Sequence, residues 1–276
     1  MSNQRTHYVT TTDGVTIGGT VRGKGPALVF LQGIIGDSDL DWQPTVEHLT
    51  DRFTCHLPSM RGRGLSGDHS DLSMDRLVAD FVAYVESIGE PTGLVGWSGG
   101  GSWALYVAAL SDSVCAVAPF EPGMLYLLDE PEQAALGGAL ASTGALAADG
   151  MLPEAARAFA GWPFNEKELE AAEAAGYFAA AGRYVPNMLN FIQQAVQSPP
   201  AGDPAAPLGA ISVPVTVLLG SESKPFFLIS AEHVVDNVAN AQIQQIPGAG
   251  HAAPLTHPEA LAEALIEFFS RTHVYA

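Results

Sequence analysis

Residues 94–105 read Leu94-Val95-Gly96-Trp97-Ser98-Gly99-Gly100-Gly101-Ser102-Trp103-Ala104-Leu105. Apolar residues lead into a glycine-rich turn with a serine at its apex, and further apolar residues follow it. This order predicts a buried strand, a sharp turn and a helix. A serine at the apex is held above the strand end in strained backbone angles, and its neighbours must be small. The first amides of the helix point to the same place, where they favour negative charge.

The segment 96–100 fits the pattern G-x-S-x-G. It resembles the nucleophile elbow of the α/β-hydrolase fold superfamily, here a serine hydrolase with a cap domain. In a chain with 29 glycines this five-residue pattern can arise by chance. The strand pattern before it and the helix pattern after it make the match specific. The resemblance implies that Ser98 is a nucleophile.

Composition limits the classes of protein that the chain can be. Its 276 residues are enough for one large α/β domain, or for a core domain with an insertion. A net charge of −18 disfavours binding to nucleic acid or to anionic membranes. Residues 1–7 contain no apolar signal core and no run is long enough to span a membrane, so we expect a cytoplasmic protein. Cys55 and Cys115 lie in short apolar runs, which indicates buried thiols.

Strand and helix patterns alternate along the chain and predict a mostly parallel sheet with helices on both faces. An Asp-Gly turn at 13–14 predicts a hairpin over residues 7–22. Further strands are expected at 27–31, 53–58, 114–120, 213–220 and 242–247, and helices at 46–49, 74–88, 226–238 and 258–269. The fold class is therefore α/β, and the resemblance implies the α/β-hydrolase fold with a sheet of the eight-stranded type.

Between the strands at 114–120 and 213–220 the pattern changes to alanine-rich segments with apolar residues at helical spacing. Helices are expected at 133–148, 153–159, 166–181 and 187–196, followed by a Pro-rich linker at 198–204. We interpret residues 122–205 as a helical cap inserted into a core domain made of residues 1–121 and 206–276.

A serine nucleophile needs a base to take its proton, and the base needs an acid that fixes its tautomer. In the superfamily these residues follow the order serine, acid, histidine along the chain. His251 ends a Gly-x-Gly-His loop after the last expected strand, and Ala-Ala-Pro follows it. His251 is therefore the predicted base.

The acid has two candidates. Relatives most often place an aspartate three residues after the glycine that ends the strand at 213–220, but Ser223 stands there. Glu222 is its neighbour in the sequence. A known variation places the acid at the end of the strand after the nucleophile helix, and Glu121 occupies that position, before Pro122. We prefer Glu121 and keep Glu222 as the alternative.

The loop after the strand at 27–31 would supply the second amide of an oxyanion hole. Relatives usually carry His-Gly there, whereas this chain has Gln32-Gly33. Because the donor is a backbone amide, the change of side chain does not remove it. We expect the amides of Ile34 and Gly99 to bind the oxyanion, with Gly33 allowing the close approach.

A narrower resemblance is carried by the segments 120–122, 221–227 and 247–251. Together they look like the zearalenone-lactonase type of α/β-hydrolase, in which the acid follows the strand after the elbow, as Glu121 does. The aspartate nucleophile of haloalkane dehalogenases and epoxide hydrolases of this fold is absent. No cluster of residues has metal-ligand spacing, so neither a metal nor a cofactor is expected.

These observations predict a carboxylic ester hydrolase or lactonase that works through an acyl-enzyme on an uncharged, fairly apolar small molecule. Two alternatives stay open: carbon–carbon bond hydrolysis by the same triad, and a non-catalytic ligand-binding protein with this fold. A homodimer fits the sequence as well as a monomer does. Candidate walls of the substrate pocket are apolar or aromatic residues near the predicted site: Trp97, Met124, Tyr126, Trp162, Met188 and Phe226.

Overall fold

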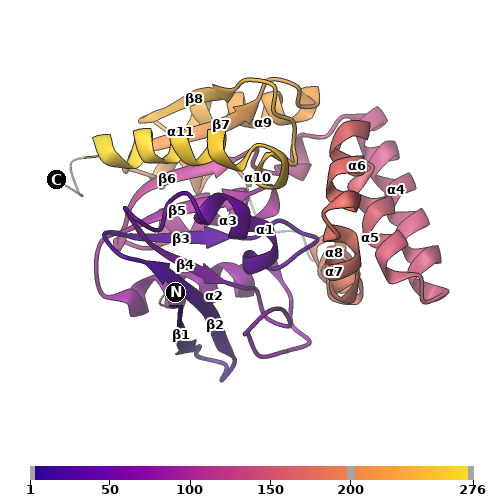
Figure 1. Cartoon of the computed structure of the whole chain (residues 1–276), viewed down its shortest axis with the longest axis horizontal. Helices are drawn as coiled ribbons and strands as arrows, with labels where there is room; N and C mark the ends of the chain where they lie inside the picture. The colour runs from indigo at the N-terminus through magenta and orange to yellow at the C-terminus, as the bar shows by residue number, and fades with distance from the viewer. Residues whose placement is uncertain (1–3, 198–202, 273–276) are drawn as a thin grey trace.

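A computed structural model describes residues 4–197 and 203–272, and it contains one eight-stranded sheet (Figure 1). The strands are β1 (Arg5–Thr10), β2 (Thr16–Gly23), β3 (Ala27–Leu31), β4 (Thr54–Pro58), β5 (Thr92–Trp97), β6 (Val114–Phe120), β7 (Val215–Gly220) and β8 (Ala241–Ile246). Their order is β1-β2-β4-β3-β5-β6-β7-β8. Only the pairings of β2 with β1 and with β4 are antiparallel. The predicted mostly parallel sheet is confirmed.

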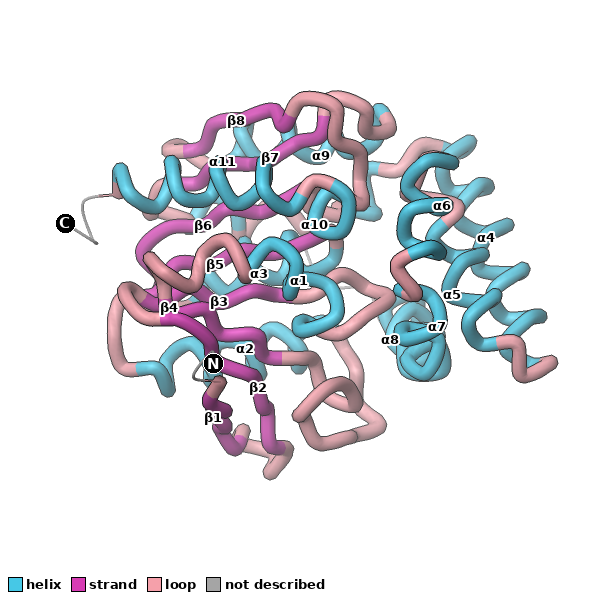
Figure 2. Tube along the Cα trace, viewed as in Figure 1, coloured by secondary structure: helices cyan, strands magenta, loops and turns pink. Residues whose placement is uncertain are grey.

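Helices cover both faces of the sheet (Figure 2). One face carries α1 (Ser38–Val46), α10 (Ala253–Thr256) and α11 (Pro258–Arg271), and the other carries α2 (Met74–Ile88), α3 (Gly99–Leu110) and α9 (Pro225–Asn237). Each layer has its own apolar cluster, with Trp42 and Leu265 in the first and Trp103 and Val234 in the second. Strands β3, β5 and β6 are buried along their whole length because both faces are covered.

Five helices lie together beside the sheet, at the right of Figure 1. They are α4 (Glu130–Ala148), α5 (Leu152–Ala160), α6 (Glu166–Ala174), α7 (Tyr177–Ala181) and α8 (Val185–Gln197), and we call them the cap helices. The described residues between β6 and β7 also form three short 3-10 turns, η1 (Leu125–Leu127), η2 (Gly182–Tyr184) and η3 (Leu208–Ala210). The cap helices fall within the predicted cap at 122–205, whose separation as a domain stays a prediction. Residues 198–202 of the predicted linker lie outside the described residues.

Two helix predictions were wrong in their bounds. The helix expected at 46–49 is α1, which ends at Val46 and begins eight residues earlier because the Asp37 side chain accepts a hydrogen bond from the Leu40 amide at 2.8 Å. The helix expected at 166–181 is divided into α6 and α7, because Gly176 between them adopts a left-handed φ of 73°.

The parallel strands bring distant loops together. The carboxyl ends of β3, β5, β6, β7 and β8 meet at the edge of the sheet that faces the cap helices (Figure 1). Ser98, Glu121 and His251 all lie in loops at this edge. Within the described ranges, no helix is both long and apolar enough to cross a membrane.

Close packing of α3 on the end of β3 allows a test of the fold. A Cβ atom at Gly100 would lie 2.2 Å from the carbonyl oxygen of Gln32, whereas a Cβ atom at Gly137, inside α4, would meet nothing within 4 Å. We expect Gly100→Ala to lower the free energy of unfolding by about 2 to 3 kcal/mol through overpacking. Gly137→Ala should raise it by up to about 1 kcal/mol through helix propensity. Urea denaturation measures both, and equal effects would contradict the packing described.

Candidate active site

Ser98 stands at the apex of the turn from β5 to α3, in backbone angles of φ 56° and ψ −117°. Among residues 4–197 and 203–272, Ser98 and Glu121 are the two non-glycine residues with positive φ. Such strain persists only where the surrounding structure enforces it, and it is common at functional sites. The Ser98 side chain is partly exposed, and its hydroxyl makes no hydrogen bond within the described part of the chain.

His251 and Glu121 form a buried pair. His251 Nδ1 lies 2.6 Å from Glu121 Oε2, and the two side chains are 2% and 0% exposed. The other carboxylate oxygen, Oε1, accepts hydrogen bonds from the Gly220 amide at 2.8 Å and from the Ser223 hydroxyl. Hydrogen-bond donors thus surround a carboxylate that water does not reach.

The two candidate acids occupy different environments. Glu222 is exposed at the surface, and within the described residues its side chain makes no hydrogen bond or ion pair with His251 or Ser98. Ser223 occupies the place where relatives were expected to carry an aspartate, and its hydroxyl donates to the Glu121 carboxylate. The loop after β7 therefore contributes a donor to the pair, and the carboxylate comes from the loop after β6.

Two contacts that the sequence analysis did not predict fix the His251 ring and its loop. The Phe227 ring, from α9, stacks on the imidazole with the ring centroids 3.9 Å apart and the planes 12° from parallel. Trp97 Nε1 donates to the carbonyl oxygen of His251 at 2.8 Å. No local sequence pattern predicts these contacts, because they join residues far apart in the chain.

Ser98 and His251 line one small cavity of about 20 Å³, which has room for about one water molecule. The remaining walls are mostly aromatic or aliphatic and come from the loop after β3, from the elbow, from α5 and α7, and from the loop between α5 and α6: Gly33, Ile34, Ile35, Trp97, Phe159, Trp162, Pro163, Phe164 and Tyr177. A substrate much larger than water therefore has to displace some of these side chains.

The six predicted pocket residues have different locations. Trp97 and Trp162 line the cavity, and Phe226 packs against Trp162 with ring centroids 5.7 Å apart. The other three do not line it. Met124 and Met188 are buried in the two apolar clusters, and Tyr126 is 41% exposed, with its hydroxyl 3.1 Å from His233. Large apolar side chains look alike in sequence whether they pack in a core or line a cavity.

The loop Gln32–Gly36, which we call the oxyanion loop, is braced by side chains behind it. Gln32 Nε2 donates to the Gly36 carbonyl at 2.7 Å, and Gln32 Oε1 accepts from the Met60 amide at 2.9 Å. Arg63 Nη1 donates to the carbonyls of Ile34 at 2.8 Å and of Gly36 at 2.7 Å. The glutamine that replaces the usual histidine thus serves as an internal brace of the loop.

The backbone amides of this region have different partners. The Gly33 amide donates to Asp41 Oδ2 at 2.7 Å. The amides of Ile34 and Gly99 have no acceptor in the portion of the chain that the structure describes. A Cβ atom built on Gly99 would lie 3.9 Å from Ile34 Cβ, so the two loops approach each other beside Ser98. This arrangement can accept a negatively charged oxygen.

Asp41 is a buried acid that the sequence analysis did not identify. Its side chain is inaccessible to solvent, and Oδ1 accepts from the Tyr177 hydroxyl at 2.9 Å. Burial raises the pKa of Asp41 to about 7, and the hydrogen bonds from Tyr177 and Gly33 oppose this shift. The oxyanion loop is therefore anchored by a carboxyl group that ionises near neutral pH.

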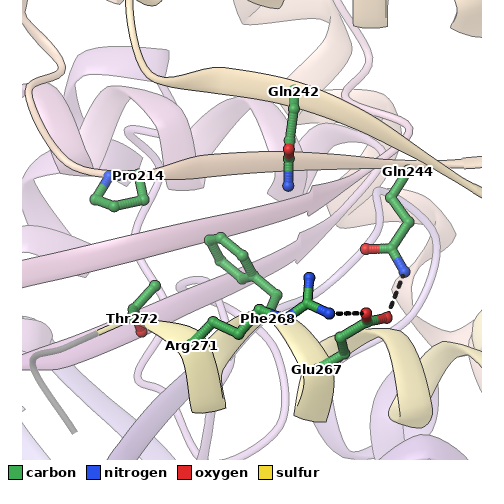
Figure 3. Close-up of a pocket in the computed structure, with 7 residues that line it drawn as sticks. All are labelled: Pro214, Gln242, Gln244, Glu267, Phe268, Arg271 and Thr272. Atoms are coloured by element: carbon green, nitrogen blue, oxygen red, sulfur yellow. Dashed lines mark hydrogen bonds and ion pairs between the residues drawn. The ribbon is translucent and has the colours of Figure 1, made fainter. Parts of the chain in front are cut away.

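A larger groove of about 410 Å³ lies at the outer edge of the sheet, between β8 and α11 (Figure 3). Glu267 in this groove pairs with Arg271 at 2.5 Å and accepts from Gln244 Nε2 at 3.3 Å, and Phe268 lies beside them. None of the predicted site residues lines it. Within the described ranges, no three His, Cys, Asp or Glu side chains gather where they could hold a metal ion.

Comparisons with known proteins agree with the fold of the chain. A family model described as "Alpha/beta hydrolase family" matches residues 28–264. A crystal structure of an alpha/beta hydrolase from Sphaerobacter thermophilus superimposes with a TM-score of 0.72 and 25% identity, covering 95% of this chain and 100% of that one.

Two curated relatives are much longer than the region they share with this chain. The polyketide synthase ThaQ of Burkholderia thailandensis is 26% identical over 268 residues, which are 91% of this chain and 12% of the synthase. The pimeloyl-[acyl-carrier protein] methyl ester esterase of Xanthomonas oryzae pv. oryzae is 36% identical over 99 residues, which are 36% of this chain and 37% of the esterase. The similarity thus spans about an eighth of the first protein and little more than a third of the second.

The pKa of Asp41 predicts a pH dependence of stability. The folded pKa of about 7 lies above the ordinary value of 3.8, so the folded protein favours the neutral acid. The stabilisation that the neutral acid gives the folded protein is fully present below pH 3.8. It is lost as the pH rises from 3.8 through 7, at about 1.4 kcal/mol per pH unit. As the pH rises from 5 to 7, the free energy of unfolding of wild type should therefore fall by on the order of 3 kcal/mol relative to that of Asp41→Asn, as measured by urea denaturation. Parallel pH curves for the two proteins would contradict the assignment.

Proposed function

The chain belongs to the alpha/beta hydrolase family, and we propose that it is a serine hydrolase that cleaves an uncharged, fairly apolar carboxylic ester or lactone. The observation that carries the proposal is the buried pair of His251 and Glu121, 2.6 Å apart, whose histidine lines the same cavity as Ser98. A strained serine, a histidine and a carboxylate in this chain order are the parts that acyl transfer requires.

In the proposed reaction, Ser98 Oγ attacks the carbonyl carbon of the ester while His251 Nε2 takes the hydroxyl proton. Glu121 accepts the hydrogen bond from His251 Nδ1, which fixes the tautomer and stabilises the imidazolium. The amides of Ile34 and Gly99 donate to the oxyanion of the tetrahedral intermediate. His251 then gives its proton to the leaving alkoxide, and the C–O bond breaks to form an acyl-enzyme.

Hydrolysis of the acyl-enzyme repeats these steps with water. His251 takes a proton from the water molecule as its oxygen attacks the acyl carbon, and returns a proton to Ser98 Oγ as the acid leaves. With a lactone as substrate, the released alcohol stays attached to the acyl group, so one hydroxy acid is the product. Both classes of substrate need the same residues.

The lining of the cavity supports an uncharged substrate. No lysine, arginine, aspartate or glutamate lines it, and the hydroxyl of Tyr177 is already used by Asp41. A charged group in this place would lose its hydration with no partner of opposite charge. The similarity to a protein named as a methyl ester esterase supports an ester as the substrate class.

Substitutions test the triad. Ser98→Ala should abolish turnover of p-nitrophenyl butyrate and leave thermal unfolding nearly unchanged. Glu121→Gln should lower kcat by about three to four orders of magnitude, because the histidine loses the acceptor that fixes its tautomer. Glu222→Gln is the matched control and should stay within about twofold of wild type, because its side chain is exposed at the surface.

Two results would contradict the proposal. A Ser98→Ala variant that keeps full activity excludes Ser98 as the nucleophile. A larger loss of kcat in Glu222→Gln than in Glu121→Gln would transfer the role of the acid to Glu222.

A further inference from the structure

Two buried carboxyl groups connect the cap helices to the loops on either side of Ser98. Asp41, in α1, receives a hydrogen bond from Tyr177 of α7 and another from the Gly33 amide of the oxyanion loop. Glu168, in α6, accepts a hydrogen bond from the amide of Ala252, which directly follows His251. The cap helices thus contact both of the loops that the proposed reaction needs.

The connection from Tyr177 through Asp41 to the oxyanion loop consists of two short hydrogen bonds between buried groups, which restrict the movement of all three residues. Tyr177 is 3% exposed, and its hydroxyl lies 2.9 Å from Asp41 Oδ1. Asp41 Oδ2 in turn lies 2.7 Å from the Gly33 nitrogen. A Cβ atom at Gly36 would lie 2.0 Å from Asp41 Oδ1, so the carboxyl group is packed directly against the loop. A movement of the Tyr177 hydroxyl is therefore transmitted to the oxyanion loop through one side chain, that of Asp41.

The second connection holds the loop of His251. Glu168 Oε1 lies 2.6 Å from the Ala252 nitrogen, and Oε2 lies 2.9 Å from the Asn165 nitrogen in the capping box that begins α6. A Cβ atom at Gly250 would lie 2.6 Å from Glu168 Oε1, so the glycine before His251 leaves room for the carboxylate. Glu168 is 4% exposed, and burial raises its pKa, while the nearby His251 acts in the opposite direction.

We propose that Tyr177 and Glu168 are positioning residues by which the cap helices hold the oxyanion loop and the loop of His251 in their reactive arrangement. The inference rests on the proposed function and adds a role for the cap helices beyond covering the cavity. When these helices are seated on the core, the Ile34 amide and the His251 ring are both held at the cavity that Ser98 lines. When they lift, both loops lose an anchor at the same time.

Hydrogen–deuterium exchange of the full chain tests each connection separately. Tyr177→Phe should speed exchange in peptides covering residues 32–36 by at least about tenfold and leave residues 248–253 unchanged. Glu168→Ala should speed exchange at residues 248–253 and leave residues 32–36 unchanged. Glu168→Gln, which keeps an oxygen acceptor, should restore protection at 248–253. Each variant serves as a folding control for the other, because each leaves the second loop protected.

Tyr184→Phe is the matched control for Tyr177→Phe. Tyr184 is also a buried tyrosine of the cap region, and its hydroxyl donates to a core carboxylate, that of Asp37. Its hydroxyl makes no hydrogen bond with Asp41 or Gly33, and Tyr184→Phe keeps the ring, whose centroid lies 5.6 Å from the guanidinium carbon of Arg63, the residue that braces the oxyanion loop. Its loss should therefore leave exchange at residues 32–36 close to that of wild type.

Kinetics on p-nitrophenyl butyrate give a second readout. Tyr177→Phe should lower kcat by at least about tenfold and change KM by less than about threefold, since a misplaced oxyanion donor slows the chemical step. Tyr184→Phe should keep kcat within about twofold of wild type.

The outcomes separate the two proposals. Equal exchange in the Tyr177→Phe and Tyr184→Phe variants at residues 32–36, or unchanged exchange at 248–253 in Glu168→Ala, overturns the positioning role whatever the activity. Changed exchange with unchanged kcat also overturns it, because the loops would then be held without effect on the reaction. Absence of turnover in wild type, together with the expected exchange pattern, would overturn the proposed function and leave the two connections as structural contacts.

Discussion

The hydrogen bond between Glu121 and His251 is the interaction on which the site depends. It joins two side chains with almost no exposure to solvent, and such a pair is stable only when the remaining polar atoms are satisfied. The Gly220 amide and the Ser223 hydroxyl meet that requirement from the end of β7, and Glu121 accepts a left-handed φ of 45° to reach them. The ends of β6, β7 and β8 must therefore keep their relative register for the pair to exist.

Much of the arrangement could be predicted from sequence because its signals are local. The elbow at Ser98 combines a strand, a glycine turn and a helix within twelve residues, and the bounds of α2 are those that the apolar spacing indicates. The preference for Glu121 over Glu222 rested on its place after the strand that follows the elbow helix and on the resemblance to hydrolases that carry their acid there. By contrast, the donor role of Ser223 and the stacking of Phe227 on His251 join residues that no local pattern relates. Met124 and Met188 lie in the apolar clusters and not in the lining of the small cavity, and a buried methionine has the same sequence signature in either place.

The small cavity and the contacts of the cap helices involve the same part of the chain. The cavity of about 20 Å³ beside Ser98 has room for about one water molecule, and the aromatic side chains of Phe159, Trp162 and Phe164 form part of its wall. The same group of helices carries Tyr177 and Glu168, whose hydrogen bonds reach the two loops of the site. Under the proposed function, the part of the chain that lines the cavity also holds the two loops of the site, which is one way that binding energy can serve orientation.

Reaction with a fluorophosphonate, followed by intact mass measurement and peptide mapping, tests the central claim most directly. An organophosphate of this kind needs an activated nucleophile beside an oxyanion hole, and it does not depend on knowledge of the natural substrate. The account predicts one rapid adduct, mapped to Ser98, that forms more slowly when Glu121 is replaced by glutamine. A folded wild-type protein that gains no adduct, or that gains one at another residue, would contradict the account and favour a ligand-binding protein that shares the fold.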